Sequence, residues 1–174
     1  MHIDLHPIWI PRSYNKVADL ISKFNDTDDW RVSDDVFKVF NLKWGPHNFD
    51  RFASSNNAKC ELFNCLHYCP GTAGVDCFKH DWSGYCNWLA PPVKLVPKVL
   101  IHMDRCKANG TLVVPKWTSA AFWPLLVNNL GEFKPFIKDH VEYCKPMNFF
   151  CSHSHNIFNV NFRSNVFVLR LEFS

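Results

Sequence analysis

The 174-residue sequence contains no long apolar run and no visible secretory signal. Its apolar stretches are only a few residues long, whereas a transmembrane helix needs about 20. The first seven residues lack the positive charge followed by an apolar stretch that opens a signal peptide. We therefore expect an intracellular protein of the cytoplasm or nucleus that is neither secreted nor embedded in a membrane.

The cysteine pattern also lacks a signature, because no two of the eight cysteines are separated by two residues as in zinc knuckles. Cys60, Cys65 and Cys69, with His67 between them, resemble a metal cluster only loosely. Proteins inside cells usually keep such scattered thiols reduced. The expectation is reduced cysteines and no metal site.

What the sequence does contain is enough apolar material for one folded domain. Apolar residues make up 47% and charged residues 20%, which is typical of globular proteins and not of disordered tails. The net charge of +3 and a pI near 8.4 are mildly basic. Such a balance is compatible with binding to nucleic acid but does not require it.

Besides a short helix expected over residues 15–23, three helices are expected from the spacing of apolar residues and from capping residues. Residues 30–42 show the helical period and begin at Ser33, a residue type that caps helices. Residues 97–106 form the second expected helix, stopped by Gly110. The third is expected over residues 119–130.

Strands are expected between these helices. Residues 49–53 and the buried run 112–114 precede turn signals, and residues 166–173 alternate as a final strand that could pair in a hairpin with residues 147–160. Strands that alternate with helices predict a three-layer α/β fold. Its sheet is expected to be mainly parallel with an antiparallel C-terminal edge.

A rigid elbow is the most informative local feature. Pro91 and Pro92 follow an expected strand, where they fix the backbone and remove two amide donors. Open α/β sheets bind ligands at the carboxyl ends of their strands. We therefore expect the serine-rich bend at residues 53–56 to face the elbow across neighbouring strands, with Asp76 at a further strand end.

Several pieces, in this order and spacing, together carry a family resemblance: Trp44-Gly-Pro-His-Asn-Phe-Asp50-Arg-Phe-Ala-Ser54, Asn57-Ala-Lys, Val75-Asp76, Asp81-Trp82-Ser-Gly, Pro91-Pro92, Leu-Val-Val-Pro115-Lys-Trp117, Phe122-Trp123-Pro124 and Phe162-Arg163-Ser-Asn165-Val. With them, residues 30–173 resemble the DNA adenine methyltransferase-like (phage Dam-type) domain found in polyproteins of DIRS-type retroelements, a class of retrotransposon.

The segment before this region resembles a different protein. Residues 1–24 contain Trp9-Ile-Pro11-Arg12 and Asn15-x-x-Ala18-Asp19-x-x-Ser22, which are similar to the closing segment of a retroelement ribonuclease H. The resemblance implies three parts: a ribonuclease H remnant over residues 1–24, an acidic linker over 25–29 and the methyltransferase-like domain over 30–174. It also implies other parts of a reverse transcriptase and ribonuclease H polyprotein as partners.

The resemblance implies a Rossmann-like methyltransferase sheet and transfer of a methyl group from S-adenosylmethionine to adenine in DNA. Cofactor contacts are then expected from residues after the first strand and at a later strand end: Asp50, Phe52, Ala53, Ser54 and Asp76. The substrate is expected beside Trp88, Lys94 and Lys98. Plainer readings remain open, in which Trp88 is core, the lysines line a solvated helix face and Asp76 caps a loop.

The elbow departs from the family motif, which is Asn or Asp, then Pro-Pro, then an aromatic residue. Here the degenerate motif consists of Ala90, Pro91, Pro92 and Val93, with Asn87 as a displaced substitute for the missing acceptor. Alanine accepts no hydrogen bond and valine cannot stack on a base. The sequence therefore predicts weak or absent catalysis, with no cofactor if the site is fully degenerate. The alternatives are a non-enzymatic nucleic-acid-binding module and a structural part of the polyprotein.

Overall fold

The computed structural model describes residues 31–151 and 162–174. Residues 1–30, with the expected ribonuclease H remnant and linker, lie outside the described residues, as do residues 152–161. Within the described ranges, no helix is long and apolar enough to cross a membrane.

A seven-stranded sheet forms the centre of the molecule, in the order β4-β3-β2-β5-β6-β9-β7. The strands are β2 (Phe49–Asp50), β3 (Leu62–Cys65), β4 (Gly74–Val75), β5 (Cys86–Leu89), β6 (Asn109–Pro115), β7 (Ile137–Tyr143) and β9 (Val166–Glu172). The first five in sheet order pair in parallel, whereas β9 pairs antiparallel with both β6 and β7. The expectation of a mainly parallel sheet with an antiparallel C-terminal edge is confirmed.

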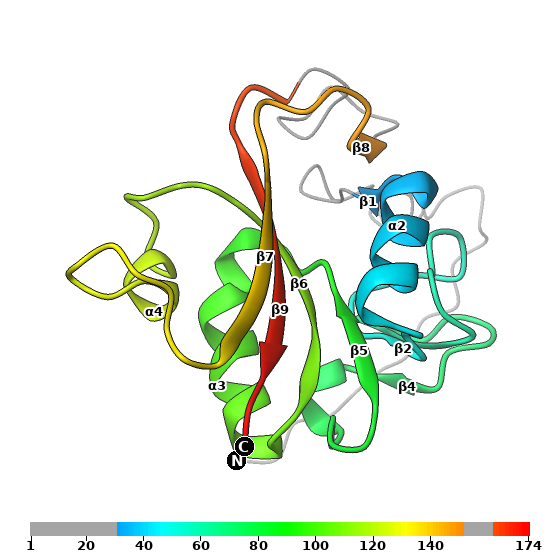
Figure 1. Ribbon diagram of the computed structural model, residues 1–174. Coiled ribbons are helices and arrows are strands. Elements are labelled where there is room, and N and C mark those ends of the chain that lie inside the picture. Colours follow the sequence, from blue (N-terminus) through cyan, green and yellow to red (C-terminus); the bar gives the residue numbers. More distant parts are fainter. Residues whose placement is uncertain (1–30, 152–161) are drawn as a thin grey trace, which may run out of the picture.

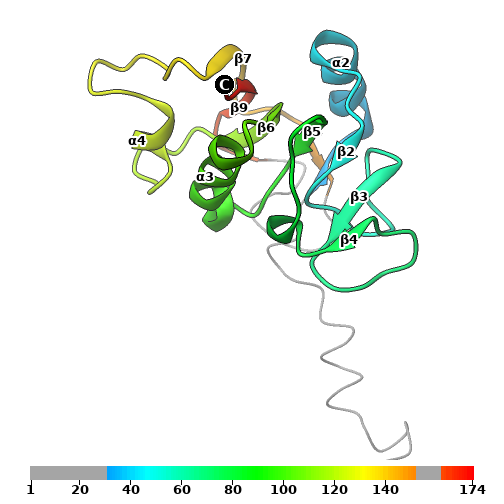
Figure 2. The ribbon, with the colours of Figure 1, turned by 90° about the horizontal axis from the view of Figure 1, so that it is seen from below.

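The helices lie on both sides of this sheet (Figures 1 and 2). Helix α2 (Asp34–Trp44) lies on one side, and α3 (Val96–Cys106) lies on the other with the short α4 (Trp123–Leu126). The expected three layers are therefore present. A small second sheet pairs β1 (Arg31–Val32) with β8 (Phe150–Cys151).

Alternation along the strands divides the core into two clusters. Leu89, Leu112 and Val114 face α3 and α4, whereas Trp88 and Val113 face α2. Successive side chains of a strand point to opposite faces, so a strand that is apolar throughout supplies both layers. This accounts for the unbroken apolar run in β6.

The helix boundaries follow local chemistry. Helix α2 begins where expected, since the Ser33 hydroxyl accepts a hydrogen bond from the Val36 amide at 3.4 Å and Asp34 and Asp35 occupy the first turn. Helix α3 ends earlier than Gly110, at Lys107, which adopts a left-handed conformation with φ 50°. Gly110 instead lies inside β6, where a Cβ would overlap the Asn87 carbonyl oxygen.

Two expected elements are corrected. The helix predicted over residues 119–130 shrinks to the four residues of α4, in which Pro124 occupies the first turn and the Val127 amide still reaches Trp123. The C-terminal strand was expected to pair with residues 147–160, but β9 lies between β6 and β7. Of that predicted partner segment, the part that the structure describes contains β8, which pairs with β1.

The β2–β3–β4 half of the sheet has less cover than the other half. Its connections, residues 51–61 and 66–73, are fully described and contain no helix. The 3-10 turn η1 (Cys77–Lys79) and the loop that follows it lie beside this half. Because these connections supply no helix to cover this part of the sheet, its cover depends on polar side chains.

Candidate functional site at the carboxyl edge of the sheet

The bend and the elbow leave the sheet from adjacent parallel strands. The chain runs outward from β2 to β3 and β4, then returns to β5 on the other side of β2. Such a reversal of strand order leaves a crevice at the carboxyl edge, where open α/β sheets bind ligands. The Arg51 amide donates to the Trp88 carbonyl at 3.1 Å, which extends the β2–β5 pairing to the start of the bend. The expected placement of bend and elbow across neighbouring strand ends is confirmed.

Asp50, the last residue of β2, holds the bend in shape. Its two carboxylate oxygens accept hydrogen bonds from the amides of Phe52 at 3.2 Å and Lys59 at 3.0 Å, so one side chain closes the loop at both ends. Asp50 is buried, and burial raises its pKa to about 6. Asp50 therefore positions the bend, and the cofactor contact that the sequence predicted here stays a prediction.

The rest of the bend is also tied to the protein. Phe52 packs edge-on against Phe78 and Trp82, and the Ala53 amide donates to the Asn64 carbonyl at 3.1 Å. The Ser54 amide donates to the Asn57 side chain at 2.6 Å. In a loop that binds a cofactor, such backbone amides are open to the ligand. At Ala53 and Ser54 they donate to the protein itself.

Asp76 follows β4 and keeps more freedom than Asp50. One oxygen accepts from the Phe78 amide at 3.3 Å, which caps η1 as the plainer reading predicted. The other lies 4.0 Å from the Lys79 ammonium, and the side chain is one third exposed. Of the residues predicted to contact the cofactor, Asp76 has the carboxylate oxygen most open to a ligand.

The elbow has the predicted rigidity. Strand β5 ends at Leu89, Pro91 is buried, and the Pro92 carbonyl accepts from the Leu95 amide at 2.8 Å to start η2 (Val93–Leu95). Val93 packs between the two core clusters. Ala90, partly exposed at the tip of the strand, presents only a methyl group.

Asn87, which was predicted as a substitute acceptor, lies in β5 with its side chain bonded inside the protein. The side chain is fully buried, with 0% exposure. Its amide nitrogen donates to the carbonyls of Trp82, Tyr85 and Asn109, at 3.0, 3.1 and 2.8 Å, and its oxygen accepts from Arg51 Nε at 2.7 Å. Because its donors and its oxygen are engaged inside the protein, Asn87 has nothing to offer a substrate.

Of the three predicted substrate contacts, one is buried and two are exposed. Trp88 is 1% exposed and packs edge-on against Phe37 and His47 under α2, as the plainer reading as core expected, and its substrate role stays a prediction. Lys94 and Lys98 are exposed just beyond the elbow. The Lys98 ammonium lies 3.9 Å from the centre of the Phe78 ring.

Sequence reasoning missed two features near this edge. Cys65 and Cys69 are joined by a disulfide across the loop that follows β3, contrary to the expectation of reduced thiols. The two sulfur atoms meet because of the way that loop folds, which the spacing of the cysteines in the sequence did not reveal. The other six cysteines are free, and the described residues contain no group of three or more metal-ligating side chains.

The second missed feature is Arg51, which is 2% exposed. It donates from Nε to Asn87 and from Nη1 to Asn64 Oδ1 at 3.1 Å, and so joins β2 to both neighbouring strands. Asparagines inside two expected strands, Asn64 in β3 and Asn87 in β5 on either side of β2, were a signal that could have revealed a buried polar partner.

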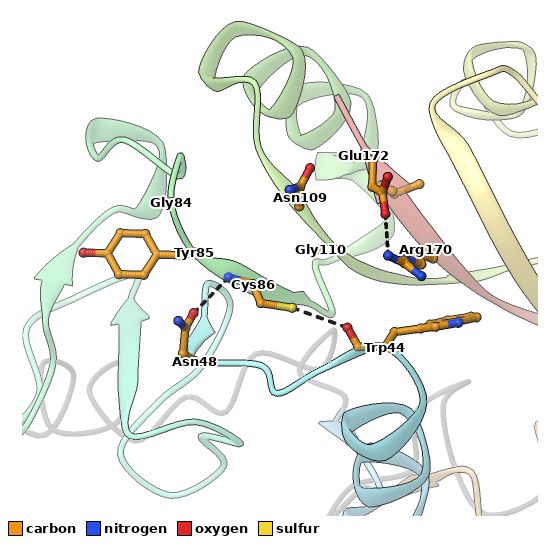
Figure 3. Close-up of a pocket in the computed structure, with 10 residues that line it drawn as sticks. Trp44, Asn48, Gly84, Tyr85, Cys86, Asn109, Gly110, Arg170 and Glu172 are labelled. Atoms are coloured by element: carbon orange, nitrogen blue, oxygen red, sulfur yellow. Dashed lines mark hydrogen bonds and ion pairs between the residues drawn. The ribbon is translucent and has the colours of Figure 1, made fainter. Parts of the chain in front are cut away.

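A larger hollow lies at the opposite edge of the sheet, as Figure 3 shows. It measures about 430 Å³ and surrounds the amino ends of β5 and β6, with the ion pair of Arg170 and Glu172 at 2.6 Å on one side. Gly84 and Gly110 are among the residues that line it. The hollow shares no residue with the bend or the elbow, and strand direction favours the carboxyl edge as the reaction site.

Comparison with known proteins now decides the family. A family model described as DNA N-6-adenine-methyltransferase (Dam) matches residues 21–174. The chain belongs to this family. The match begins ahead of the expected linker at residues 25–29 and covers the whole sheet. The family resemblance seen in the sequence is thus confirmed at the level of the Dam domain.

One curated relative is similar over a shorter stretch. The protein named "Putative methyltransferase YfdM" of Escherichia coli (strain K12) is 36% identical over 56 residues, which are 32% of this chain and 54% of that protein. The chain spans about half the length of this relative.

Proposed function

We propose that this Dam-family domain has lost most or all of its adenine methyltransferase activity. The observation that carries the proposal is the elbow, where Ala90 stands at the position of the family's hydrogen-bond acceptor. The one nearby amide, Asn87, is saturated by the protein's own backbone and by Arg51. The elbow is rigid and correctly placed, yet it lacks the group that would hold the target amine.

The expected loss is large. Removing one preorganised polar contact of this kind costs about two to three orders of magnitude in rate. Val93 in place of an aromatic residue removes a stacking partner, worth about 1–3 kcal/mol in capture of a flipped base. The two losses occur at one elbow.

The described residues fit S-adenosylmethionine poorly. The resemblance places the cofactor against the bend, but the Asp50 oxygens and the amides of Ala53 and Ser54 are bonded within the protein. The bend also has no glycine to let a ligand approach the backbone. Asp76 remains as the carboxylate best able to contact the ribose or adenine. Cofactor affinity weaker than micromolar forms part of the proposal.

The test is a methylation assay. Wild-type protein, S-adenosylmethionine and unmethylated duplex DNA should yield no N6-methyladenine above background, whereas an active Dam-family enzyme run in parallel should. Calorimetry with the cofactor alone should show no saturable micromolar binding, and Asp76→Ala should leave that result unchanged. Methylation by the wild type at the rate of the active enzyme would overturn the proposal.

Restoring the elbow motif tests separately the two parts of the proposal, the defect in the elbow and the defect in the bend. Ala90→Asn with Val93→Tyr supplies the acceptor and the ring, and Ala90→Leu with Val93→Tyr is the size-matched control without an acceptor. We expect neither variant to methylate DNA, because the bend is unchanged. Activity in the asparagine variant alone would show that the bend accepts cofactor, and would leave the elbow as the sole defect.

A second candidate function is binding of nucleic acid without chemistry. Lys94 and Lys98, both exposed beside the elbow, are the observation that favours it. Cationic side chains at this edge can pair with backbone phosphates whether or not a methyl group is transferred.

The genetic context is a further part of the proposal. The motifs in residues 1–24 and 30–173 support an origin in a DIRS-type retroelement, with a reverse transcriptase and ribonuclease H polyprotein as partner and an intracellular location in cytoplasm or nucleus. Sequencing the genomic locus tests this origin. An upstream reading frame for a reverse transcriptase and ribonuclease H, continuous with this chain, is the expected result, and its absence would contradict the origin.

A further inference from the structure

A second hollow lies over the β2–β3 half of the sheet, away from the elbow. It has a volume of about 260 Å³ and is lined by Phe49, Arg51, Leu62, Ala73, His80, Asp81 and Tyr85. Arg51 directly follows β2 and continues its pairing with β5, and its guanidinium lies over the ring of Phe49, the first residue of that strand. The connections at residues 51–61 and 66–73 place no helix over this part of the sheet, so the hollow remains open to solvent.

The Arg51 guanidinium has donors to spare in this hollow. An arginine side chain carries five N–H groups. Nε donates to Asn87, one Nη1 group donates to Asn64, and one Nη2 group reaches the Asp81 carbonyl at 3.5 Å, the limit of a hydrogen bond. One N–H on each terminal nitrogen is left without a partner among the described residues.

The positive charge also lacks a carboxylate. Within residues 31–151 and 162–174, no carboxylate lies within ion-pair distance of Arg51. Asp81, which also lines the hollow, uses its carboxylate to accept from the amide and hydroxyl of Ser83 at 2.9 and 2.7 Å. The guanidinium lies instead 3.5 Å from the centre of the Phe49 ring and 5.1 Å from that of Tyr85.

A charge buried in this way is costly unless something pairs with it. Burial lowers the pKa of Arg51 to about 10, which leaves the group protonated at neutral pH. The aromatic faces and amide oxygens offset part of the desolvation. What remains is a positive group that lines the hollow and has two N–H donors without a partner, and guanidinium donors of this kind recognise planar or tetrahedral oxyanions.

We propose that this hollow is a binding site for an oxyanion, a phosphate or carboxylate group that accepts the two spare N–H bonds of Arg51. The volume admits such a group with a few waters, since a water occupies about 30 Å³ in the liquid. His80 and Tyr85 at the rim supply further polar atoms. The hollow reaches the carboxyl end of β2 through Arg51 but includes none of residues 53–56 or 90–93, and its existence does not depend on the function proposed above.

The test replaces a neighbour of Arg51 and leaves the arginine in place. Leu62 is 41% exposed, lines the hollow and pairs with Phe49 across β2 and β3. Leu62→Glu puts a carboxylate beside the guanidinium, and Leu62→Gln is the neutral control of equal size. Inorganic phosphate, titrated against sodium chloride at constant ionic strength, is the probe.

We expect the wild type and Leu62→Gln to bind phosphate saturably in the millimolar range. Leu62→Glu should bind at least about tenfold more weakly, because its own carboxylate neutralises the charge. Nitrogen NMR of the Arg51 side chain should show shifted guanidinium signals with phosphate in the wild type, and the same direction of shift without phosphate in Leu62→Glu. If Arg51 only supported the fold, phosphate would not shift its guanidinium signals.

Duplex DNA separates the two sources of the anion. If the site takes a backbone phosphate, Leu62→Glu lowers DNA affinity relative to Leu62→Gln and reduces the salt slope by about one. If it takes a free anion, the two variants bind DNA equally while phosphate binding still differs. Unchanged Arg51 signals at saturating phosphate, or equal phosphate binding by both variants, would overturn the proposal.

Discussion

Buried polar side chains, more than the expected ligand contacts, account for the shape of the carboxyl edge. Asp50 closes the bend through two backbone amides, and Asn87 connects three carbonyls to Arg51. The polar atoms of Asp50 and Asn87 are satisfied by protein, as buried polar groups generally are. Asp50 and Asn87, which the sequence suggested as ligand contacts, thus form hydrogen bonds that hold the fold.

Truncation of Asn87 should destabilise the protein strongly. Asn87→Ala leaves three carbonyls and Arg51 Nε without their partner in the interior, and each unsatisfied buried group costs about 1–3 kcal/mol. We expect the free energy of unfolding to fall by about 3 kcal/mol or more in urea denaturation. Asn56→Ala, at an exposed position of the bend, is the control and should change it by less than about 0.5 kcal/mol. Equal stability of the two variants would contradict the assigned network.

Asp50 should make stability fall as the pH rises. Its pKa is raised from 3.8 to about 6 in the folded protein, so folding favours the protonated form. The stabilisation from this group is full below pH 4 and is lost as the pH rises through 6. Asp50→Asn removes the titration. The stability of the wild type minus that of the variant should therefore drop by about 2 kcal/mol between pH 4 and pH 7. A constant difference over this range would show that Asp50 does not titrate as described.

At the scale of elements, the sequence predicted those whose signal is local. Ser33 and the apolar period located the start of α2, and the apolar run located the centre of β6. Strand β7 was missed because only alternate residues at its start are partly buried and its partner β9 is distant in sequence. The long helix expected at residues 119–130 failed since Pro124 fits only a first turn.

The elbow and the bend were predicted together because proline and turn residues carry their geometry locally. Which side chains around them remain open to a ligand was not predictable. That depends on contacts such as Arg51 with Asn87, between residues 36 positions apart. Burial of Trp88 under α2 has the same origin, because it depends on which face of β5 the helix covers.

Close approach of β5 and β6 gives an element-scale prediction. Gly110 lies where a Cβ would overlap the Asn87 carbonyl oxygen and crowd its side chain. Gly110→Ala should push the two strands apart and lower stability by about 2 kcal/mol. Gly84→Asn is the matched control in the same hollow, since its site is open and asparagine tolerates its φ of 72°. Thermal unfolding of both variants provides the measurement, and equal midpoints would refute the packing argument.

At the scale of the whole molecule, the two edges of the sheet have different characters. The carboxyl edge has the rigid elbow and the bend, and exposed Lys94 and Lys98 follow the elbow. The amino edge has the larger hollow with its Arg170–Glu172 ion pair, but no strand there ends in a catalytic motif (Figure 3). If the fold retains a contact with nucleic acid, strand direction places it at the carboxyl edge.

DNA binding should therefore depend on which lysines are removed. Lys94→Gln with Lys98→Gln should weaken duplex binding in fluorescence anisotropy and reduce the slope of log affinity against log salt by up to about two, since each lost phosphate contact releases one counterion fewer. Lys107→Gln with Lys138→Gln removes the same charge at the amino edge, after α3 and at the start of β7. This control pair should bind DNA as the wild type does. Equal weakening by both pairs would mean that net charge alone attracts the DNA, and that the carboxyl edge is not its binding surface.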